Sequence, residues 1–454
     1  MNISESFLQS IDELQKQEIP QPVICRSRQS LLDYLAVTSA GARFQTDKLN
    51  NYYEFAIPES GEFTIIGSER KLTLMEAVYL NGLNAHALDF DDGTNSGIIH
   101  LGAPIFSLLL PLAQRYDIKL ETLLQAAVIG YEVSYTMAIS IQPIHKAMGY
   151  HATGTCGTLG ATLAASYMLE FSDEERFQAF ACACIAASGM LKVLDDGSEL
   201  KPYNVAKTAL LSLTALQMAK AGFRGHPDPL GGRGFLKMMT GRDDIELKPV
   251  LLNNTYAIMK SYTKPYASCR YTHPSVEAAI YIRNQYGIKA ESIESIDIRT
   301  YSLAVLGHDH TEIPGTYSAK MSIPYSTAVG LIFGKVGLQE FSEEVVKNSK
   351  ILALTKKVHV TADQELSKAF PSIQAAVVDI TANGQKYSKR VDFPKGEPEN
   401  PLDDKEFKGR YNELMRYANI EEKVSNEIFN LIYEKNTSVN DILELFGGDY
   451  IEPE

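Results

Sequence analysis

The chain of 454 residues is 45% hydrophobic and 22% charged, and its formal net charge at pH 7 is −13. This length favours two domains, and the composition is that of an ordinary globular protein with a large buried core. The negative charge argues against nucleic acid as a partner, because binding to phosphates needs a basic face. An enzyme acting on anionic substrates would have to gather cations at its site against this overall field.

Sequence features predict a cytoplasmic protein. No run approaches the roughly 18 to 20 uninterrupted apolar residues that span a bilayer, so we expect no membrane association. Residues 1–17 lack the basic-then-apolar pattern of a secretory signal and predict an amphipathic helix. The five cysteines are an odd number without disulfide-like spacing: Cys25, Cys156, Cys182, Cys184 and Cys269. Cys182 and Cys184 form a CxC pair, but on a helix they point to different faces, so we interpret them as reduced thiols and not as metal ligands.

Residues 1–262 are predicted to form helix after helix. In the segment 28–42, Leu31, Leu32 and Leu35 return at helical spacing. Further helical runs cover residues 72–88, 104–116, 121–141, 157–171, 173–191 and 205–223. Several of these runs are rich in Ala, Gly and Ser, which indicates helices that pack closely in a large bundle.

The pattern changes near residue 263. Four segments alternate like strands: 292–302, 356–362, 373–384 and 385–393. The step Asn383-Gly384 between the last two segments predicts a tight hairpin. Helical segments are interleaved with these strands, so residues 263–394 predict a smaller α+β domain.

Residues 395–454 begin with a proline-rich, acidic linker and continue in a helical pattern. The tail is therefore expected to rejoin the first domain. The predicted fold is mainly α, with a large all-helical domain formed by residues 1–262 and 395–454. The smaller α+β domain, residues 263–394, is inserted in it.

The first segment with candidate chemistry is HALDFDDGTNSGIIHLGAP, residues 86–104. Its polar members include His86, Asp89, Asp91, Asp92, Thr94 and His100. Carboxylates this close repel one another, so at least one is expected to be paired, shifted in pKa or exposed. The alternative is a loop that ends one helix and caps the next. Such a run can also hold Mg²⁺, but no phosphate-binding loop accompanies it.

The second segment is GYHATGTCGTLGATLAAS, residues 149–166. It places His151 before a Gly/Thr-rich turn that is expected to open a helix, where backbone N–H groups can hold a carboxylate. A histidine at this place can move a proton near neutral pH. The alternative is a buried histidine at a helix N-cap. The glycine spacing does not match a dinucleotide-binding fingerprint.

Two further segments carry lysines. DDGSELKPYNVAK holds Lys201 and Lys207, whereas YTKPYASCRYTHPS holds Lys264, Cys269, Arg270 and His273. Lysines are usually solvated surface charges, and this interpretation applies fully to Lys207. Lys264 and Arg270 lie instead at the expected domain junction, where clefts form preferentially.

Three more residues are candidates with a simpler interpretation. Tyr325 opens an apolar helix, where a tyrosine is more often part of the core. His308 and His310 have the residue type of metal ligands, but we interpret GHDHTE as an exposed loop.

Taken together, these segments resemble the MmgE/PrpD family. HALDFDD, GYHATGTCGTLGA, the DGS…K segment and KPYASCRYTHP followed by SIPYS occur in the family's order and approximate spacing, over most of the chain. The family includes 2-methylcitrate dehydratase, cis-aconitate decarboxylase and iminodisuccinate epimerase. The resemblance implies a helical domain with an inserted α+β lid domain, a homodimer, and an active site between the domains without metal or organic cofactor.

The resemblance also implies roles for individual residues. The catalytic set is His151 as acid/base, with Asp89, His100 and Tyr325. The substrate-binding set is Lys201, Lys264, Arg270, Thr94, Cys269 and His273, with the two lysines holding substrate carboxylates. The loop after Asp91 is one residue longer than in the decarboxylases, which affects the alignment of Thr94. Cys269 stands where the decarboxylases carry a histidine.

The resemblance implies proton transfer next to a carboxylate, with cations neutralising the charge that develops. We expect a cofactor-independent lyase acting on a small polycarboxylic acid. Because of Cys269, dehydration of a citrate- or 2-methylcitrate-like substrate is placed ahead of decarboxylation of a cis-aconitate-like one. The alternatives are an epimerase or eliminating enzyme for iminodisuccinate-like or succinylated amino acids, and a catalytically silent dimeric binding protein.

Overall fold

The computed structural model describes residues 1–192 and 198–446, and the chain divides into two compact units. The first unit comprises residues 1–192, 200–261 and the C-terminal segment from Asp404. The second unit is Tyr262–Asp403, with a short segment before Leu200. The second unit is thus inserted in the sequence of the first.

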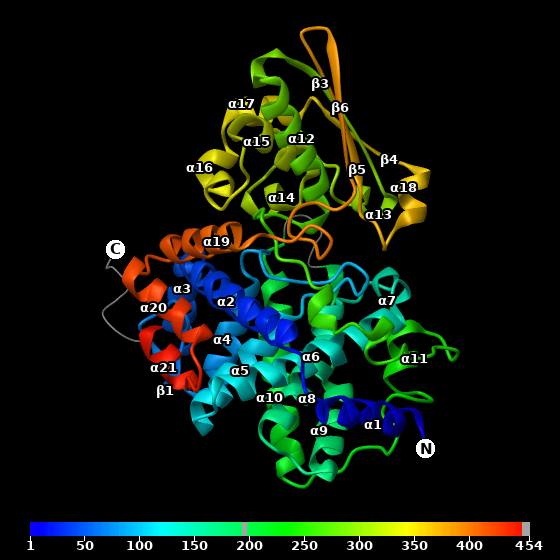
Figure 1. Ribbon diagram of the computed structural model, residues 1–454, viewed down its shortest axis with the longest axis vertical. Helices are drawn as coiled ribbons and strands as arrows, with labels where there is room; N and C mark the ends of the chain where they lie inside the picture. Colours follow the sequence, from blue (N-terminus) through cyan, green and yellow to red (C-terminus); the bar gives the residue numbers. More distant parts are fainter. Residues whose placement is uncertain (193–197, 447–454) are drawn as a thin grey trace. The chain divides into compact units, whose positions relative to one another are not determined.

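The first unit is built from helices (Figure 1). In chain order they are α1 (Ile3–Gln15), α2 (Gln21–Phe44), α3 (Thr46–Ala56), α4 (Leu74–His86), α5 (Gly102–Tyr116), α6 (Leu120–Ile141), α7 (Ile144–Ala147), α8 (Ala152–Met168), α9 (Asp173–Ala186), α10 (Lys201–Lys220), α11 (Phe235–Thr240), η2 (Leu252–Asn254), η3 (Ala257–Lys260), α19 (Asp404–Tyr417), α20 (Glu422–Tyr433), α21 (Val439–Leu443) and η7 (Glu444–Phe446). Within the described ranges, none of the helices combines the length and the apolar character needed to cross a bilayer.

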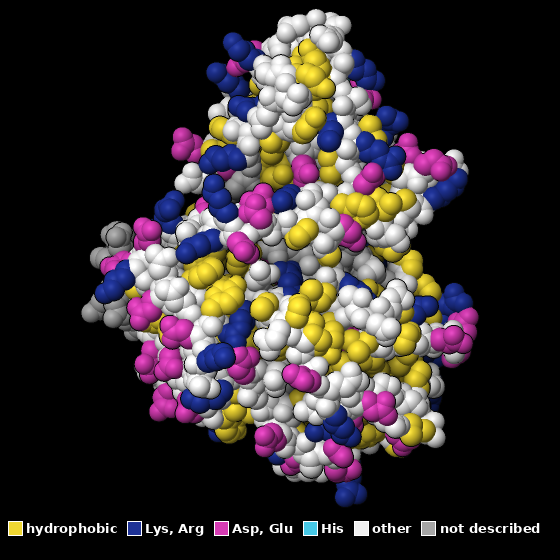
Figure 2. All heavy atoms as spheres, in the orientation of Figure 1, with side chains coloured by type: hydrophobic (Ala, Val, Ile, Leu, Met, Phe, Trp, Pro, Cys, Tyr) yellow, Lys and Arg dark blue, Asp and Glu magenta, His cyan; other side chains and the backbone are white. Residues whose placement is uncertain are grey.

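Charged side chains of both signs are interspersed on the face of the first unit that Figure 2 shows. Lys and Arg alternate there with Asp and Glu, so on this face the negative net charge of the chain is not gathered into one block. A mixed surface of this kind favours solubility without creating a strong local field.

Helix α8 is buried along nearly its whole length and packs against α5, α6, α9 and α10. Its residues are apolar or small on every side, so no face of the helix is suited to solvent. An added Cβ at Gly160 would lie 1.8 Å from Ser134 Oγ of α6 and 2.5 Å from the backbone oxygen of Gly130. This confirms the close packing predicted from the small residues. The Gly/Thr-rich stretch after His151, expected as a turn, is instead the first half of α8.

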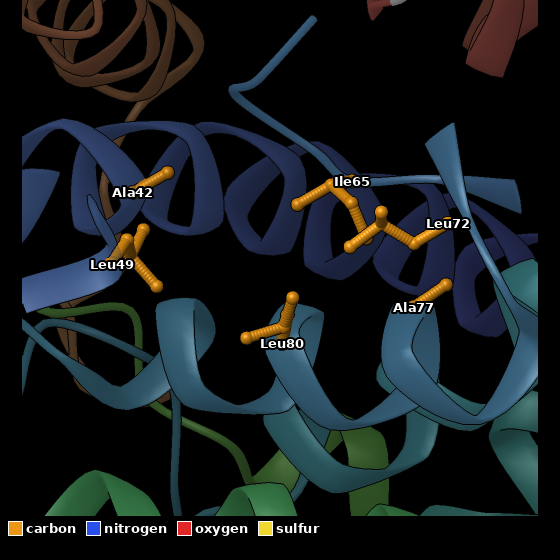
Figure 3. Packing of buried hydrophobic residues seen from close by; sticks show 6 residues of the cluster. All are labelled: Ala42, Leu49, Ile65, Leu72, Ala77 and Leu80. Carbon is orange, nitrogen blue, oxygen red and sulfur yellow. The ribbon is translucent and has the colours of Figure 1, made fainter. Parts of the chain in front are cut away.

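One small sheet in the first unit was not predicted. β1 (Ser60–Thr64) and β2 (Lys71–Leu72) pair antiparallel. A compact apolar cluster lies beside them (Figure 3), formed by Ala42, Leu49, Ile65, Leu72, Ala77 and Leu80. Strand β2 is only two residues long, too short to show an alternating pattern in the sequence.

The second unit mixes short helices with strands. Its elements are η4 (Arg270–Thr272), α12 (His273–Tyr286), η5 (Ala290–Ser292), β3 (Ile293–Thr300), α13 (Ser302–Val305), α14 (Thr316–Met321), α15 (Ile323–Phe333), η6 (Gln339–Phe341), α16 (Glu343–Val346), α17 (Ser349–Thr355), β4 (Val358–Ala362), α18 (Gln364–Ala369), β5 (Ala376–Ala382) and β6 (Gln385–Val391). The strand order in its sheet is β4-β3-β5-β6. β3 and β4 are parallel, and the other two pairs are antiparallel. The mainly α fold with a smaller α+β part is therefore confirmed.

All four predicted strands are present, and the predicted hairpin joins β5 to β6. Ala382 and Gln385 are register partners at its end. Asn383 and Gly384 between them have φ angles of 51° and 73°, the left-handed region that a tight hairpin turn requires.

The second unit extends to Asp403, beyond the expected end at residue 394, because the intervening segment packs within it. Thr263 N donates to the backbone oxygen of Gly396 (2.9 Å), and the buried side chains of Arg270 and Glu397 form an ion pair. The proline-rich segment is therefore part of the second unit.

Candidate active site

Three helix ends of the first unit carry a cluster of polar side chains. α4 ends at His86, His151 is the N-cap residue of α8, and Lys201 is the first residue of α10. Helix α10 packs against both α4 and α8, which brings these ends together. The loop between α4 and α5 supplies the remaining members of the cluster.

Asp92 anchors this loop. Its Oδ1 accepts a hydrogen bond from Gly102 N (2.9 Å), and its Oδ2 accepts one from the Tyr131 hydroxyl (2.5 Å). Its backbone oxygen lies 2.8 Å from His100 Nδ1. Burial raises the pKa of Asp92, and the two hydrogen bonds to its side chain act in the opposite direction. Asp92 therefore fixes the loop to α5 and α6 and orients His100.

Lys201 and Asp89 form an ion pair, with Nζ 2.5 Å from Oδ1. His100 Nε2 lies 3.8 Å from the same oxygen. Asp89 has a φ of 51°, a left-handed conformation that aspartate adopts more readily than most residues. The Lys201 ammonium thus places one positive charge in the cluster, where it is paired with Asp89.

Asp91 lies between two imidazoles. Its Oδ2 is 2.8 Å from His86 Nδ1 and 3.2 Å from His100 Nδ1. Although burial alone would raise it, the pKa of Asp91 lies well below its ordinary value because of the two histidines beside it. Burial lowers the pKa of His86 to about 4, so His86 is neutral at pH 7 and donates its Nδ1–H to the carboxylate.

Exposure increases across the cluster. The side chain of His86 is 0% exposed, that of Asp91 5%, and those of His100 and Lys201 13%. His86 therefore lies at the closed end of the cluster, and His100 and Lys201 are its more exposed members.

His151 is buried next to these groups, with its ring centroid 6.0 Å from that of His86. Its backbone N–H donates to Gly189 O (3.1 Å). Among the described residues, its Nδ1 has no hydrogen-bond partner. Burial, reinforced by the positive charge of Lys201, lowers the pKa of His151 well below its ordinary value. At neutral pH His151 is therefore an uncharged imidazole that can accept a proton.

The expectation for the three neighbouring carboxylates is confirmed. Each is buried and has a partner of its own: Lys201 for Asp89, histidines for Asp91, and Tyr131 for Asp92. Their mutual repulsion is thus offset separately at each site. Thr94 is also buried in this loop, where its N–H donates to Ile99 O (2.9 Å).

Four substrate-binding candidates lie in the second unit, on the segment leading into α12. Lys264, Arg270 and His273 are all buried. The Cys269 thiol is partly buried. The buried guanidinium of Arg270 forms an ion pair with the buried carboxylate of Glu397.

Tyr325 lies in the core of the second unit. Its side chain is fully buried, packs against Phe341 and donates its hydroxyl hydrogen to the backbone oxygen of Glu340 (3.1 Å). Burial raises the pKa of this hydroxyl. The core interpretation of Tyr325 therefore has direct structural support, whereas its role at a site stays a prediction.

The histidines of the GHDHTE segment are tied to the backbone of the second unit. His308 Nδ1 lies 2.9 Å from Met321 O, and His310 Nε2 lies 3.1 Å from Ser318 O. The expected exposed loop was wrong for His308, which is buried by its ring contact with Tyr271 and its place against α14.

His86, Asp91 and Asp92 of the cluster were not assigned roles from the sequence. His86 and Asp91 are five positions apart in HALDFDD, a spacing that a helix end followed by a turn can close. Their pairing could have been suggested by that spacing alone. Residues 195–197 of the DGS…K segment lie outside the described residues.

The cluster also contains a set of potential metal ligands. Donor atoms of His86, Asp89, Asp91 and His100 lie within 4.8 Å of one another. The Lys201 ammonium already places a positive charge against Asp89, which is the counter-charge that a divalent cation would supply. The donor set therefore fits a metal in residue type, and one of its two carboxylates already has the lysine as counter-charge.

Comparison with known proteins bears on the family of the chain. The model of the MmgE/PrpD N-terminal domain matches residues 5–248, and that of the MmgE/PrpD C-terminal domain matches residues 266–432. A cis-aconitate decarboxylase-like protein of Aspergillus oryzae is 24% identical, covering 99% of this chain and 98% of its own length. Cis-aconitate decarboxylase of Mus musculus is 23% identical, covering 90% of this chain and 86% of its own.

The decarboxylase of Aspergillus terreus is also 23% identical, over 95% of this chain and 93% of its own length. The relatives are thus similar from end to end, and both family domains match in the expected order. The chain belongs to the MmgE/PrpD family.

Proposed function

We propose that this protein is a lyase that acts on a small polycarboxylic acid by proton transfer at a carbon next to a carboxylate. The observation that supports this proposal is the cluster in which the Lys201–Asp89 ion pair lies beside three imidazoles. Loss of a proton or of CO₂ from such a carbon leaves negative charge that spreads onto the neighbouring carboxylate. A fixed cation beside that carboxylate stabilises the charge as it develops.

Lys201 is the cation suited to this task. An ammonium group has three N–H donors, so it can bind a substrate carboxylate while it stays bonded to Asp89. Asp89 holds the flexible lysine side chain in one position before substrate arrives. This preorganisation spares the reaction the cost of ordering the side chain.

Two histidines are suited to proton transfer. His151 is neutral at pH 7, so it can act as a base. The Nδ1 atom of His100 faces the backbone oxygen of Asp92 and the carboxylate of Asp91, which keeps a proton on Nδ1 and leaves the lone pair on Nε2. An imidazole oriented in this way by a carboxylate can take up a proton and return it.

The relatives guide the choice of substrate. Those that cover nearly the whole chain are named for decarboxylation of cis-aconitate, so a cis-aconitate-type tricarboxylate is the first candidate. Dehydration of a citrate- or 2-methylcitrate-type acid is the second candidate. It is supported by Cys269, which by the family resemblance stands where the decarboxylases carry a histidine.

The test is incubation of the purified protein in D₂O with cis-aconitate, 2-methylcitrate or iminodisuccinate, followed by NMR. Decarboxylation gives a product that has lost CO₂ and gained deuterium. Dehydration gives a new alkene signal, whereas epimerisation gives deuterium incorporation without net loss of substrate. The lyase proposal predicts one of the first two results.

The matched control variants lie on one helix. Lys201→Gln is expected to lower kcat/KM by about 10²–10³-fold, the size typical for loss of one group that stabilises a developing anion. Lys207→Gln, also on α10, is expected to have little effect, because the Lys207 ammonium contacts Ser188 and lies outside the cluster. Absence of turnover of every acid, or equal effects of the two variants, would contradict the proposal.

A further inference from the structure

The second unit contains a pocket of about 440 Å³ whose lining includes none of the candidate site residues. Its walls come from the end of α12, from η5, from the end of α15 and from α17. Four of the side chains that line it are cations: Arg283, Lys289, Lys350 and Lys357. Glu291 is the single carboxylate in the lining, so the pocket carries a net positive charge in a chain of net charge −13.

Within the described part of the chain, these four cations differ from their neighbours in having no ion-pair partner. Among the residues that the structure describes, no carboxylate oxygen lies within 4.0 Å of any of the four charged groups. Lysines close by in the sequence are paired: Lys347 with Glu343 (3.6 Å) and Lys356 with Glu312 (3.5 Å). The positive charge in the pocket is therefore left uncompensated by the protein itself, although acidic residues are abundant.

Two of the cations are held in place by the backbone. Arg283 Nε donates to Leu331 O (2.9 Å), and Lys357 Nζ donates to Ile293 O (2.6 Å). Gly334 leaves room for the guanidinium, because an added Cβ there would lie 2.9 Å from Arg283 Nη1. A site whose charges are positioned in advance loses less entropy when it binds an anion.

The rest of the lining is apolar. It includes Ile288, Leu331, Ile332 and Leu354. The volume falls in the range of about 300–1,000 Å³ that is usual for small-molecule sites. A ligand that satisfied only the cations would leave this apolar surface in contact with water.

We propose that this pocket binds an organic polyanion of the nucleoside diphosphate type, with linked phosphate groups on a flat apolar body. Linked phosphates can contact several cations at once, and both the arginine fork and the lysine ammonium are good phosphate donors. The flat body covers the apolar lining. This site does not depend on the proposed lyase activity, because all its residues differ from those of the candidate active site.

The experiment measures binding of three probes by isothermal titration calorimetry in magnesium-free buffer at low ionic strength. ADP carries both phosphates and a ring, pyrophosphate carries the charge alone, and adenosine carries the ring alone. We expect ADP to bind about tenfold more tightly than pyrophosphate and adenosine to bind weakest, with the affinity for ADP falling as salt is added.

The variants are matched in charge. Lys289→Gln/Lys350→Gln removes two exposed lysines of the pocket, so the fold is expected to remain intact, and it should weaken ADP binding by about tenfold. Lys347→Gln/Lys356→Gln removes two paired lysines outside the lining and should leave the affinity unchanged. The proposal is overturned if ADP shows no saturable binding, if both double variants weaken it equally, or if pyrophosphate binds as tightly as ADP.

Discussion

Arg410 Nη2 donates a hydrogen bond of 2.9 Å to the backbone oxygen of Phe90, which lies 320 positions earlier in the chain. The guanidinium also lies over the Phe90 ring, 4.3 Å from its centroid, and forms a buried ion pair with Asp33 of α2. Phe90 stands between Asp89 and Asp91 in the loop of the candidate active site. The C-terminal segment that rejoins the first unit therefore helps to hold the two carboxylates in place.

Replacing this arginine is expected to affect both stability and activity. Arg410→Met leaves Asp33 buried without its counter-charge. Burial raises the pKa of Asp33 to about 6 even with the arginine present. Breaking one side of a buried pair costs about 3–5 kcal/mol of the free energy of unfolding. Because the loop also loses its anchor at Phe90, kcat should fall more than KM rises. Urea denaturation and steady-state kinetics measure the two effects.

The double variant Asp33→Asn/Arg410→Met separates the effect on stability from the effect on activity. It removes both charges, so part of the lost free energy of unfolding should return. The anchor at Phe90 is still absent, so kcat should stay low. Recovery of full activity in the double variant would show that Arg410 acts only through its charge and not by positioning the loop.

The pH dependence of kcat/KM tests His151 as the base. Burial lowers the pKa of His151 well below its ordinary value of 6.5, so the acid limb of the profile should lie below that pH. The nearby positive charge of Lys201 contributes to this lowering. Lys201→Gln should therefore move the limb to higher pH, in addition to lowering the rate. A limb at or above the ordinary pKa of histidine, or one that the substitution leaves in place, would contradict the assignment.

Removal of metal tests the role of the four potential ligands. Dialysis against EDTA is expected to leave activity unchanged, because the Lys201 ammonium supplies the positive charge beside Asp89. Metal content measured by mass spectrometry on the same sample provides the control. Loss of activity that a divalent cation restores would instead assign His86, Asp89, Asp91 and His100 as metal ligands.

Much of the fold could be predicted from the sequence where residues close together in the chain determine the local structure. The hairpin at Asn383-Gly384 follows from two residues that tolerate a left-handed backbone, and the structure has it. The close packing of α8 follows from its glycines and alanines. The extent of the second unit could not be predicted in this way. It depends on contacts such as that between Thr263 and Gly396, which are far apart in the sequence.

The candidate site shows the same limit. Lys201 and Asp89 are 112 positions apart, so no spacing rule could place them together, and only the family resemblance did so. The contact of Arg410 with Phe90 escaped prediction because the two residues are 320 positions apart in the sequence. The His86–Asp91 pair is local, but its importance depends on the burial of both side chains, which the sequence does not reveal.

A buried histidine outside the active site should make stability depend on pH. His145 donates from Nδ1 to Met239 O (2.9 Å), and its Nε2 accepts from the Thr155 hydroxyl (2.8 Å). Burial lowers its pKa from 6.5 to about 4. Between these values the unfolded chain binds a proton that the folded protein does not. The contribution of His145, about 3 kcal/mol, is therefore fully present above pH 6.5 and is lost as the pH falls towards 4.

His145→Gln lacks this dependence, so its deficit in free energy of unfolding against the wild type should be largest near neutral pH and should shrink in acid. Urea denaturation of both proteins across this pH range tests it, because the other titrating groups are common to the two and cancel in the difference. A deficit that stays constant with pH would show that His145 titrates as it does in the unfolded chain.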